Sequence, residues 1–453
     1  MQFAKSLEVA VRLQTNGRLA EAEKIYAEIL AAEPNQPDAL HLSGVIALQS
    51  GRLEEAHQRI HKAIGVNPNV AEYYNNFGNV FVQQGKIGEA IAAFRKATIL
   101  RPSYPKAFSN FGNALKKAGQ FELATAAYQK AVALAPNYLE AKWNLGLLQL
   151  LQGDFAQGWA GFEQRLEIDE IRAGKRQFKE PRWNGEALNG KRILLHVEQG
   201  FGDTMQFARY ASLVADRGGK VALEVPPELS RLFTGLRGVE TIVARGELLP
   251  EFDIHCPLLS LPMVFGTTLA TIPNSVPYLL APNQLFEQWS HKFSAYGNRL
   301  KVGLAWAGNP RQRNDRNRSM QFDQLCELTN ISGIDFFSLQ VGPAAAQGAT
   351  SKHFARVNDL TGELKDFADT AGLIQCLDLV VSVDTAVAHL AGALGKPVWV
   401  PLAFVPDWRW HLNRADSPWY PTMRLFRQAK PGDWSAPMRE IAIALDSMRA
   451  RSI

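Results

Sequence analysis

A repeat of fixed period is the feature that most constrains how this chain can fold. Small residues and proline recur every 34 residues through the first third of the sequence, in four separate registers. A period of this length predicts helical hairpins that stack on one another into a solenoid. The repeating positions are Gly17, Gly51, Gly85, Gly119 and Gly153; Gly44, Gly78, Gly112 and Gly146; Ala22, Ala56, Ala90 and Ala124; and Pro34, Pro68, Pro102 and Pro136.

The pattern resembles the tetratricopeptide repeat, a helix-turn-helix unit of 34 residues. In each unit we expect one glycine inside the first helix, where the missing side chain lets the second helix approach. The other glycine serves the turn, and the proline closes the second helix. We expect four full repeats over about 3–136 and a fifth that degrades after Gly153, within a superhelical domain over 1–165.

Three asparagines, Asn76, Asn110 and Asn144, recur at the same spacing in the first helix of successive repeats. One interpretation is that their amides bond between neighbouring repeats. The other is a ladder along the groove that binds an extended peptide backbone, because each amide offers a donor and an acceptor. Such a ladder is a feature of the repeat domain of O-GlcNAc transferases, which this segment resembles, and the resemblance implies an acceptor held by the repeats.

The remainder of the chain predicts a linker over 166–190 and then alternating strands and helices. Short apolar runs that suit buried parallel strands lie at 192–197, 221–225, 241–243 and 253–256, and again at 301–306, 336–340, 379–383 and 397–400. We expect two Rossmann-like halves over 191–292 and 293–435, with the carboxyl ends of both sheets facing a central cleft. A helix over 436–453 is expected to pack back across the halves.

In the second half, Asp384-Thr385-Ala386 follows a buried strand and opens a helix. A free helix N-terminus suits a diphosphate, because its N–H groups are unpaired and carry partial positive charge. His389 lies one turn later on the same face. Two plainer interpretations stay open: Asp384 is an N-cap, and His389 is a packing residue.

The whole stretch from Val383 to Pro397 resembles the donor-nucleotide signature of the bacterial heptosyltransferases, glycosyltransferase family nine. The resemblance implies a GT-B fold and a nucleotide-sugar site that includes Asp384, Thr385, Ala386 and His389. The sequence departs from the family at Ala386, where glycine is common.

In the first half, the strand at 192–197 leads into Gly200-Phe-Gly202-Asp203, which resembles the opening strand and Gly-Asp turn of the same family. The resemblance implies that Asp203 is the catalytic base, and the two glycines let the backbone approach the sugar. The plainer interpretation is that Asp203 caps a helix. A dinucleotide-binding fingerprint is broken at Met205, and a dehydrogenase leaves the second half unexplained.

A basic loop, Arg311 to Arg318, follows the strand at 301–306. At the carboxyl end of that strand its arginines would face the cleft and bind phosphate oxygens; a solvated basic loop or an RNA-binding patch are the alternatives. We place Trp306, Asn309 and Arg318 nearest the donor, and expect Gln340 to reach its base or ribose. An aromatic-rich segment, 406–421, would stack on a base or sugar, or plug the domain junction.

Composition narrows the class of protein. The formal net charge of +5 is too small over 453 residues to indicate a nucleic-acid or membrane coat. Three scattered cysteines support neither a disulfide framework nor a zinc site. No signal peptide or transmembrane segment is evident, so we expect a reduced, cytoplasmic protein. No Asp-x-Asp triplet occurs, so a metal-bound diphosphate lacks its usual ligand and we expect neither metal nor cofactor.

Together these features predict a glycosyltransferase of GT-B fold that moves a hexose or heptose from a nucleotide-diphosphate donor to an acceptor hydroxyl. The resemblance implies an inverting, metal-independent reaction with Asp203 as base. The repeats would recruit a protein or glycan acceptor. The alternative is a scaffold or adaptor whose transferase-like region binds a nucleotide sugar without turnover.

Overall fold

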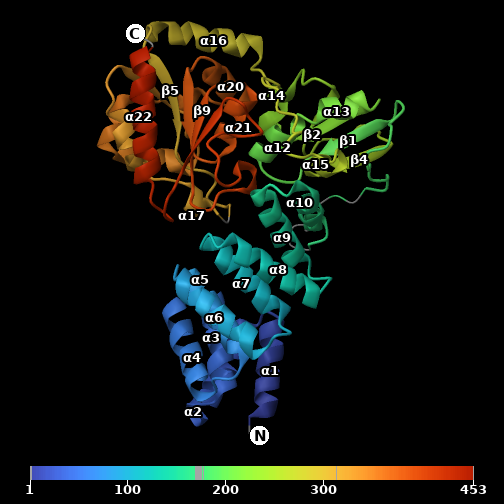
Figure 1. The fold of residues 1–453 in the computed structure, drawn as a ribbon, viewed down its shortest axis with the longest axis vertical. Helices are drawn as coiled ribbons and strands as arrows, with labels where there is room; N and C mark the ends of the chain where they lie inside the picture. The colour runs from blue at the N-terminus through green and yellow to red at the C-terminus, as the bar shows by residue number, and fades with distance from the viewer. Residues whose placement is uncertain (1–2, 169–175, 177, 313, 452–453) are drawn as a thin grey trace. The chain divides into compact units, whose positions relative to one another are not determined.

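The computed structural model describes residues 3–168, 176, 178–312 and 314–451 (Figure 1). Its contacts divide the chain into two compact units, each described here by itself. One contains Met1–Leu148 and Gln164–Ile168, and the other contains Gln149–Glu163 and Asp169–Ile453. Part of the expected linker (169–175 and 177), Arg313 of the basic loop and the last two residues of the expected C-terminal helix lie outside the described residues.

Helical hairpins build the first unit, which confirms the predicted solenoid of tetratricopeptide repeats. The helices are α1 (Ala4–Thr15), α2 (Leu19–Ala32), α3 (Pro37–Gln49), α4 (Leu53–Val66), α5 (Ala71–Gln83), α6 (Ile87–Leu100), α7 (Pro105–Lys117), α8 (Phe121–Leu134) and α9 (Leu139–Gln152). Each odd-numbered helix from α1 to α7 packs against the helix that follows it.

The glycines of the repeats have the two roles expected of them. A Cβ placed on Gly78 would lie 2.6 Å from the ring of Phe94, and one on Gly112 would lie 2.7 Å from the ring of Tyr128. These positions therefore let paired helices touch. The turn glycines have positive φ, 74° at Gly51 and 76° at Gly85, a conformation that other residues adopt at a cost.

The second unit begins within the last turn of α9 and includes α10 (Phe155–Phe162), where the repeat pattern degrades. Its Trp159 donates a hydrogen bond from Nε1 to the carbonyl oxygen of Thr267 (2.8 Å) and packs edge-on against Trp408. Phe155 contacts the rings of His411 and Trp419. The amphipathic helix after the last repeat is thus part of the core of the α/β unit.

The first α/β half is a four-stranded parallel sheet in the order β3-β2-β1-β4. Its strands are β1 (Arg192–His196), β2 (Lys220–Val225), β3 (Val239–Ala244) and β4 (Ile254–Pro257), and its helices are α12 (Phe201–Ala208), α13 (Ala211–Asp216), α14 (Ser230–Phe233) and α15 (Leu261–Val264). In the register, Ile193 lies opposite both Val221 and Ile254. These residues are almost fully buried, as the continuous apolar run of β1 predicts.

The second half is a six-stranded parallel sheet in the order β10-β9-β8-β5-β6-β7. Its strands are β5 (Leu300–Ala305), β6 (Ile334–Ser338), β7 (Val357–Asn358), β8 (Leu379–Ser382), β9 (Val398–Leu402) and β10 (Met423–Arg427). Its helices are α16 (Asn283–Phe293), α17 (Asp315–Arg318), α18 (Cys326–Thr329), α19 (Ala346–Thr350), α20 (Phe367–Gln375), α21 (Ala386–Ala393) and α22 (Ser435–Arg451). A parallel-sheet α/β region therefore follows the repeats, consistent with the GT-B class.

The C-terminal helix corrects one expectation. It was expected to cross both halves, but α22 packs against β9, β10 and α18, all in the second half (Figure 1). Met438, Ile441 and Leu445 on its inner face join the core of that sheet. The closest contact between the halves is instead made by α12 and α21.

Strand order fixes where a ligand site can form. In the second sheet β5 and β8 are neighbours, but the chain leaves β5 toward one edge and β8 toward the other. Likewise β1 lies between β2 and β4 in the first sheet. Connections that leave such strands in opposite directions open a space at their carboxyl ends, where ligands of doubly wound folds bind.

Candidate functional site

Four segments with charged side chains follow the carboxyl ends of β1, β5, β8 and β9. They are 197–203, 306–318, 383–386 and 403–411. The segments after β5 and β8 come from neighbouring strands, and the packing of α12 on α21 brings the segment after β1 to them.

Asp203 occupies the first turn of α12. Its Oδ2 accepts a hydrogen bond from the backbone N–H of Gly200 (3.0 Å), so the capping role is present in the structure. Its Oδ1 accepts from Arg409, which comes from the other half. Burial raises the pKa of the Asp203 carboxyl and the charge of Arg409 opposes that rise. Asp203 thus lies where the two halves meet, paired to a cation.

Arg318 joins the segments after β5 and β8. Its Nη1 donates to the backbone carbonyl oxygen of Asp384 (2.9 Å), and its Nε lies 3.5 Å from Oδ1 of Asp315. The guanidinium of Arg318 packs directly against the backbone of Gly308, which has no side chain. A Cβ at this position would lie 2.7 Å from Nη2 of Arg318. The side chain is 18% exposed and reaches the start of α21, and its place beside a donor stays a prediction.

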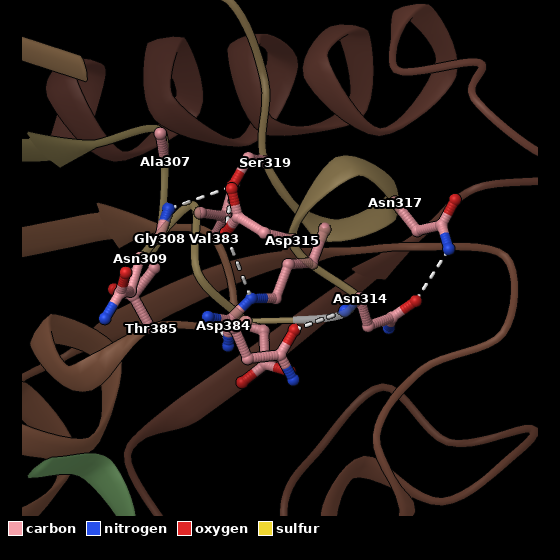
Figure 2. Close-up of polar contacts among 12 residues, drawn as sticks. Ala307, Gly308, Asn309, Asn314, Asp315, Asn317, Ser319, Val383, Asp384 and Thr385 are labelled. Atoms are coloured by element: carbon pink, nitrogen blue, oxygen red, sulfur yellow. Dashed lines mark hydrogen bonds and ion pairs between the residues drawn. The ribbon is translucent and has the colours of Figure 1, made fainter. Parts of the chain in front are cut away.

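Ser319 fixes the basic loop from within. Figure 2 shows its hydroxyl between Gly308 and Asp315: it accepts from the backbone N–H of Gly308 and donates to Oδ1 of Asp315, both at 2.9 Å. Asn314 and Asn317 are linked by a further side-chain bond. Polar side chains of the described part of this segment therefore bond to one another and to its backbone.

The start of α21 corrects the interpretation of Asp384 as an N-cap. Thr385 is the cap, and its hydroxyl accepts from the N–H of Val387 (3.3 Å). The carboxyl of Asp384 therefore does not cap this helix. Burial and the charge of Asp407 raise the pKa of this carboxyl, and the charge of Arg318 lowers it. Ala386 is the first helical residue and is half-buried.

His389 is 5% exposed and packs where the two halves touch. A Cβ on Gly202 would lie 2.7 Å from its Cδ2, and its Nδ1 lies 2.9 Å from the hydroxyl oxygen of Tyr420. Burial and the nearby arginines lower its pKa well below the ordinary value, so the ring is neutral at physiological pH. The plainer interpretation of His389, a packing residue, fits these contacts best.

Three residues expected near the donor have other roles in the structure. Trp306 is completely buried in the core against Phe322, which corrects its placement at the site. Gln340 is also corrected, because its amide bonds the backbone of 306, 307 and 341 and so holds the loop after β5. Asn309 is exposed, and its Oδ1 accepts from the N–H of Arg311 in a local turn.

In the repeats, two of the three asparagines bond between neighbouring units. Nδ2 of Asn76 lies 2.8 Å from Nε2 of His41 on α3, and Nδ2 of Asn110 donates to Oδ1 of Asn75 (2.9 Å). The interpretation that these amides connect the repeats therefore describes Asn76 and Asn110 in this structure. Asn144 lies half-buried on α9.

The sequence interpretation missed Arg409, which bonds Asp203 and Gln206 across the halves. It lies within the aromatic-rich segment 406–421, which is expected to stack on a base or sugar or to plug the domain junction. The signal available was an Asp-x-Arg pair, Asp407 and Arg409, among tryptophans. A buried cation needs polar partners. Arg209, on the first half, is a second such cation: it is 5% exposed and bonds the carbonyls of Pro273 and Trp419.

A hollow of about 770 Å³ lies at the amino ends of β1 and β2, next to Arg192 and Lys220 and opposite the segments above. A second, of about 400 Å³, lies in the first repeats beside Leu7 and Leu42. Within the described ranges no three His, Cys, Asp or Glu side chains gather as a metal site. No helix among the same residues could span a membrane.

Comparison with protein families matches two kinds of domain. Tetratricopeptide repeat models match residues 13–75, 78–119 and 112–153. The model of glycosyltransferase family 9 (heptosyltransferase) matches residues 321–399, which include Gln340, Asp384 and His389 but not Arg318 or Asp203. The likeness of the repeats to those of O-GlcNAc transferases stays a prediction.

One curated relative is similar in sequence to about two thirds of this chain. Protein FlbA of Caulobacter vibrioides is 26% identical over 320 residues, which is 66% of this chain and 53% of FlbA. The match thus spans about half the length of that relative.

Several solved structures are similar to a little over a third of this chain. They include MamA (24% identity, TM-score 0.32, 37% of this chain and 98% of MamA) and PilW, titled a type IV pilus biogenesis factor (23% identity, TM-score 0.34, 38% of this chain and 78% of PilW). A third is YrrB, titled a TPR protein with an unusual peptide-binding site (17% identity, TM-score 0.32, 38% and 88%). The chain therefore has helical hairpins that match tetratricopeptide repeat models, followed by a parallel-sheet α/β region in which residues 321–399 match the model of glycosyltransferase family 9 (heptosyltransferase).

Proposed function

We propose that this protein is a glycosyltransferase that moves a hexose or heptose from a nucleoside-diphosphate sugar to an acceptor hydroxyl. The observation that carries the proposal is the meeting of charged segments from both halves, in which Asp203 and Arg409 pair across the halves and Arg318 bonds the start of α21. This arrangement lies at the carboxyl ends of parallel strands, next to the segment that matches family 9.

The donor diphosphate would bind at the start of α21. The first N–H groups of this helix of eight residues carry partial positive charge, and Arg318 adds a full one beside them. Thr385 occupies the N-cap, so the helix begins at a defined residue. Ala386 leaves room for a phosphate to approach the backbone.

The transfer would be an inverting displacement. Asp203 takes the proton of the acceptor hydroxyl as that oxygen attacks the anomeric carbon, and the bond from this carbon to the diphosphate oxygen breaks. The electron pair of that bond leaves with the nucleoside diphosphate, where Arg318 and the helix N-terminus stabilise the growing charge. We propose that no metal is needed, because these cationic groups take over the stabilisation of the leaving group.

The repeats would supply the acceptor, a protein or a glycan. Asn76 and Asn110 each use one amide hydrogen in a bond between repeats, and an amide has a second hydrogen to offer a peptide backbone. Together with Asn144 they would hold an extended acceptor. Cys256, Cys326 and Cys376 form no disulfide bond among the described residues, which fits the reducing cytoplasm that we propose.

One observation favours a second candidate, a scaffold that binds a nucleotide sugar without turnover. Both carboxylate oxygens of Asp203 already accept hydrogen bonds, one from Gly200 and one from Arg409. A base so engaged accepts a proton less readily than a free one.

Calorimetric titration with nucleoside diphosphates tests the donor site. We expect UDP, ADP, GDP, CDP or dTDP to bind the full chain, and Arg318→Ala to weaken the binding in a salt-sensitive way. Arg316→Ala is the matched control, because Arg316 is an exposed residue of the same short helix. Wild-type affinity in Arg318→Ala would place the diphosphate elsewhere. Chelator should leave turnover intact, and a strict metal requirement would contradict the metal-free mechanism.

A further inference from the structure

Arg409 is the cation that reaches from the second half into the first. Its guanidinium donates through Nε to Oε1 of Gln206 and through Nη2 to Oδ1 of Asp203, which lie one turn apart on α12. A third bond, from Nη1 to Oδ1 of Asp407 (2.9 Å), holds it to its own segment. The side chain is only 9% exposed, so these bonds replace its hydration.

Aromatic rings fix the plane of the guanidinium. Its central carbon lies 4.6 Å from the ring centroid of Trp408 and 5.5 Å from that of Phe207. Trp408 is itself packed edge-on by Trp159 and Trp419. Three directed bonds and a stacking surface suit arginine and not lysine, whose ammonium presents no planar fork.

The positive charge of Arg409 lowers the pKa of the Asp203 carboxyl. The charged groups that face the Asp203 carboxyl are Arg409 and Asp407, from the segment after β9, and Arg318, from the segment after β5. Asp407 and burial both favour the protonated form of Asp203, and the arginines oppose them. Arg409 is the only one of the three that bonds Asp203 directly.

We infer that Arg409 is a positioning residue for the transfer reaction: from the second half it fixes the Asp203 carboxylate on α12 and keeps it ionised as a base. The inference rests on the proposed role of Asp203. The aromatic residues of the segment 407–410 first suggest that it stacks on a sugar. The inference gives this segment another role, which is to hold the Asp203 carboxylate in place and ionised. It also accounts for the bond from Arg409 to the carboxylate, because partial burial raises the pKa of Asp203 and the charge of Arg409 lowers it.

The pH profile of kcat/KM for donor turnover tests the inference. Asp203 must be ionised to act, so activity falls as the pH drops through its pKa. Arg409→Met should move the midpoint of this acidic limb upward by about 1–3 pH units, the usual effect of an opposite charge at this distance. Gln206→Leu is the matched control, because it removes a bond to Arg409 but no charge. Its midpoint should stay at the wild-type pH.

Arg409→Lys keeps the charge and loses the planar fork, so it should keep the wild-type midpoint with a lowered kcat. If Arg409→Met does not fold, Arg409→Lys still tests the inference. A wild-type midpoint in Arg409→Met with activity reduced equally at every pH would show a merely structural role and overturn the inference. The inference would also be overturned if the midpoint of Arg409→Lys rose by the about 1–3 pH units expected of Arg409→Met.

A thermal-unfolding cycle separates this inference from the proposed function, since it needs no donor. Asp203→Asn, Arg409→Met and the double variant should show coupled losses of melting temperature at pH 8, and the coupling should shrink as the pH falls and Asp203 gains its proton. If the losses of melting temperature are coupled but the protein turns over no donor, the proposed function is contradicted and the pairing of Asp203 with Arg409 stands. Additive losses at pH 8 would overturn the pairing on which the inference rests.

Discussion

At the scale of single residues, the proposed chemistry depends most on Asp203. Asp203→Asn keeps the side-chain shape and a hydrogen-bond acceptor for Gly200 but removes the base. Turnover should fall about 100-fold or more, the scale of general-base loss, while calorimetry should find donor affinity nearly unchanged. Because the change also removes a carboxylate partner of Arg409, kinetics should be measured well below the melting temperature of the variant. Near-normal turnover would leave Asp203 as a helix cap only.

The lowered pKa of His41 predicts how the stability of the chain depends on pH. Burial lowers its pKa to about 4, below the ordinary 6.5 that it regains on unfolding. The unfolded chain therefore binds the proton more readily, so the stabilising contribution is complete above pH 6.5 and is lost as the pH falls toward 4. Each pH unit in this window removes about 1.4 kcal/mol.

The check is the melting temperature of the full chain between pH 7 and pH 4, for the wild type and for His41→Gln, which can still bond Asn76. The wild type should lose stability relative to the variant as the pH falls. Parallel curves would show that His41 does not titrate with a lowered pKa.

The meeting of Asp203, Arg318 and the start of α21 was predictable from the sequence, because each follows a recognisable buried strand and carboxyl ends of parallel strands share one edge. Trp306 shows the limit of that rule. Position after a strand does not say which side of the sheet a side chain faces, and Trp306 turns into the core. Arg409 was missed because its partners, Asp203 and Gln206, are about 200 residues away in the sequence.

At the scale of elements, the repeat glycines differ in what surrounds them. Gly78 on α5 faces the buried ring of Phe94, whereas Gly88 on α6 is exposed with nothing near a Cβ. Gly78→Ala should lower the free energy of unfolding by about 1–3 kcal/mol through overpacking. Gly88→Ala should raise it by up to about 1 kcal/mol through helix propensity. Urea unfolding followed by circular dichroism measures both, and equal effects would mean that the close approach of α5 and α6 is not tight.

Most strands were predictable to within one or two residues because their apolar runs are continuous. The strands β7 and β10 were not. Val357–Asn358 is too short to leave a pattern, and Met423–Arg427 alternates apolar residues with Arg424 and Arg427. The strand β10 exists because it pairs with β9, and such pairing is invisible in a local window.

At the scale of the whole molecule, the proposal divides the work between a repeat unit that binds the acceptor and an α/β unit that holds the donor. Changing Asn76, Asn110 and Asn144 together to Ala should raise the acceptor KM by roughly tenfold to a thousandfold, if each amide contributes about 0.5–1.5 kcal/mol. Hydrolysis of the donor by water should continue at its former rate. The melting temperature should also fall, because two of these amides connect repeats. A fall in stability with acceptor affinity intact would leave them a structural role alone.

The central claim is that this chain cleaves a nucleoside-diphosphate sugar with Asp203 as base. The most direct measurement is the release of nucleoside diphosphate from UDP-, ADP-, GDP-, CDP- and dTDP-sugars by the full chain and by Asp203→Asn. The account predicts release from at least one donor by the wild type and a rate about 100-fold lower in the variant. Release from none of these donors, or equal rates in the two proteins, would contradict it.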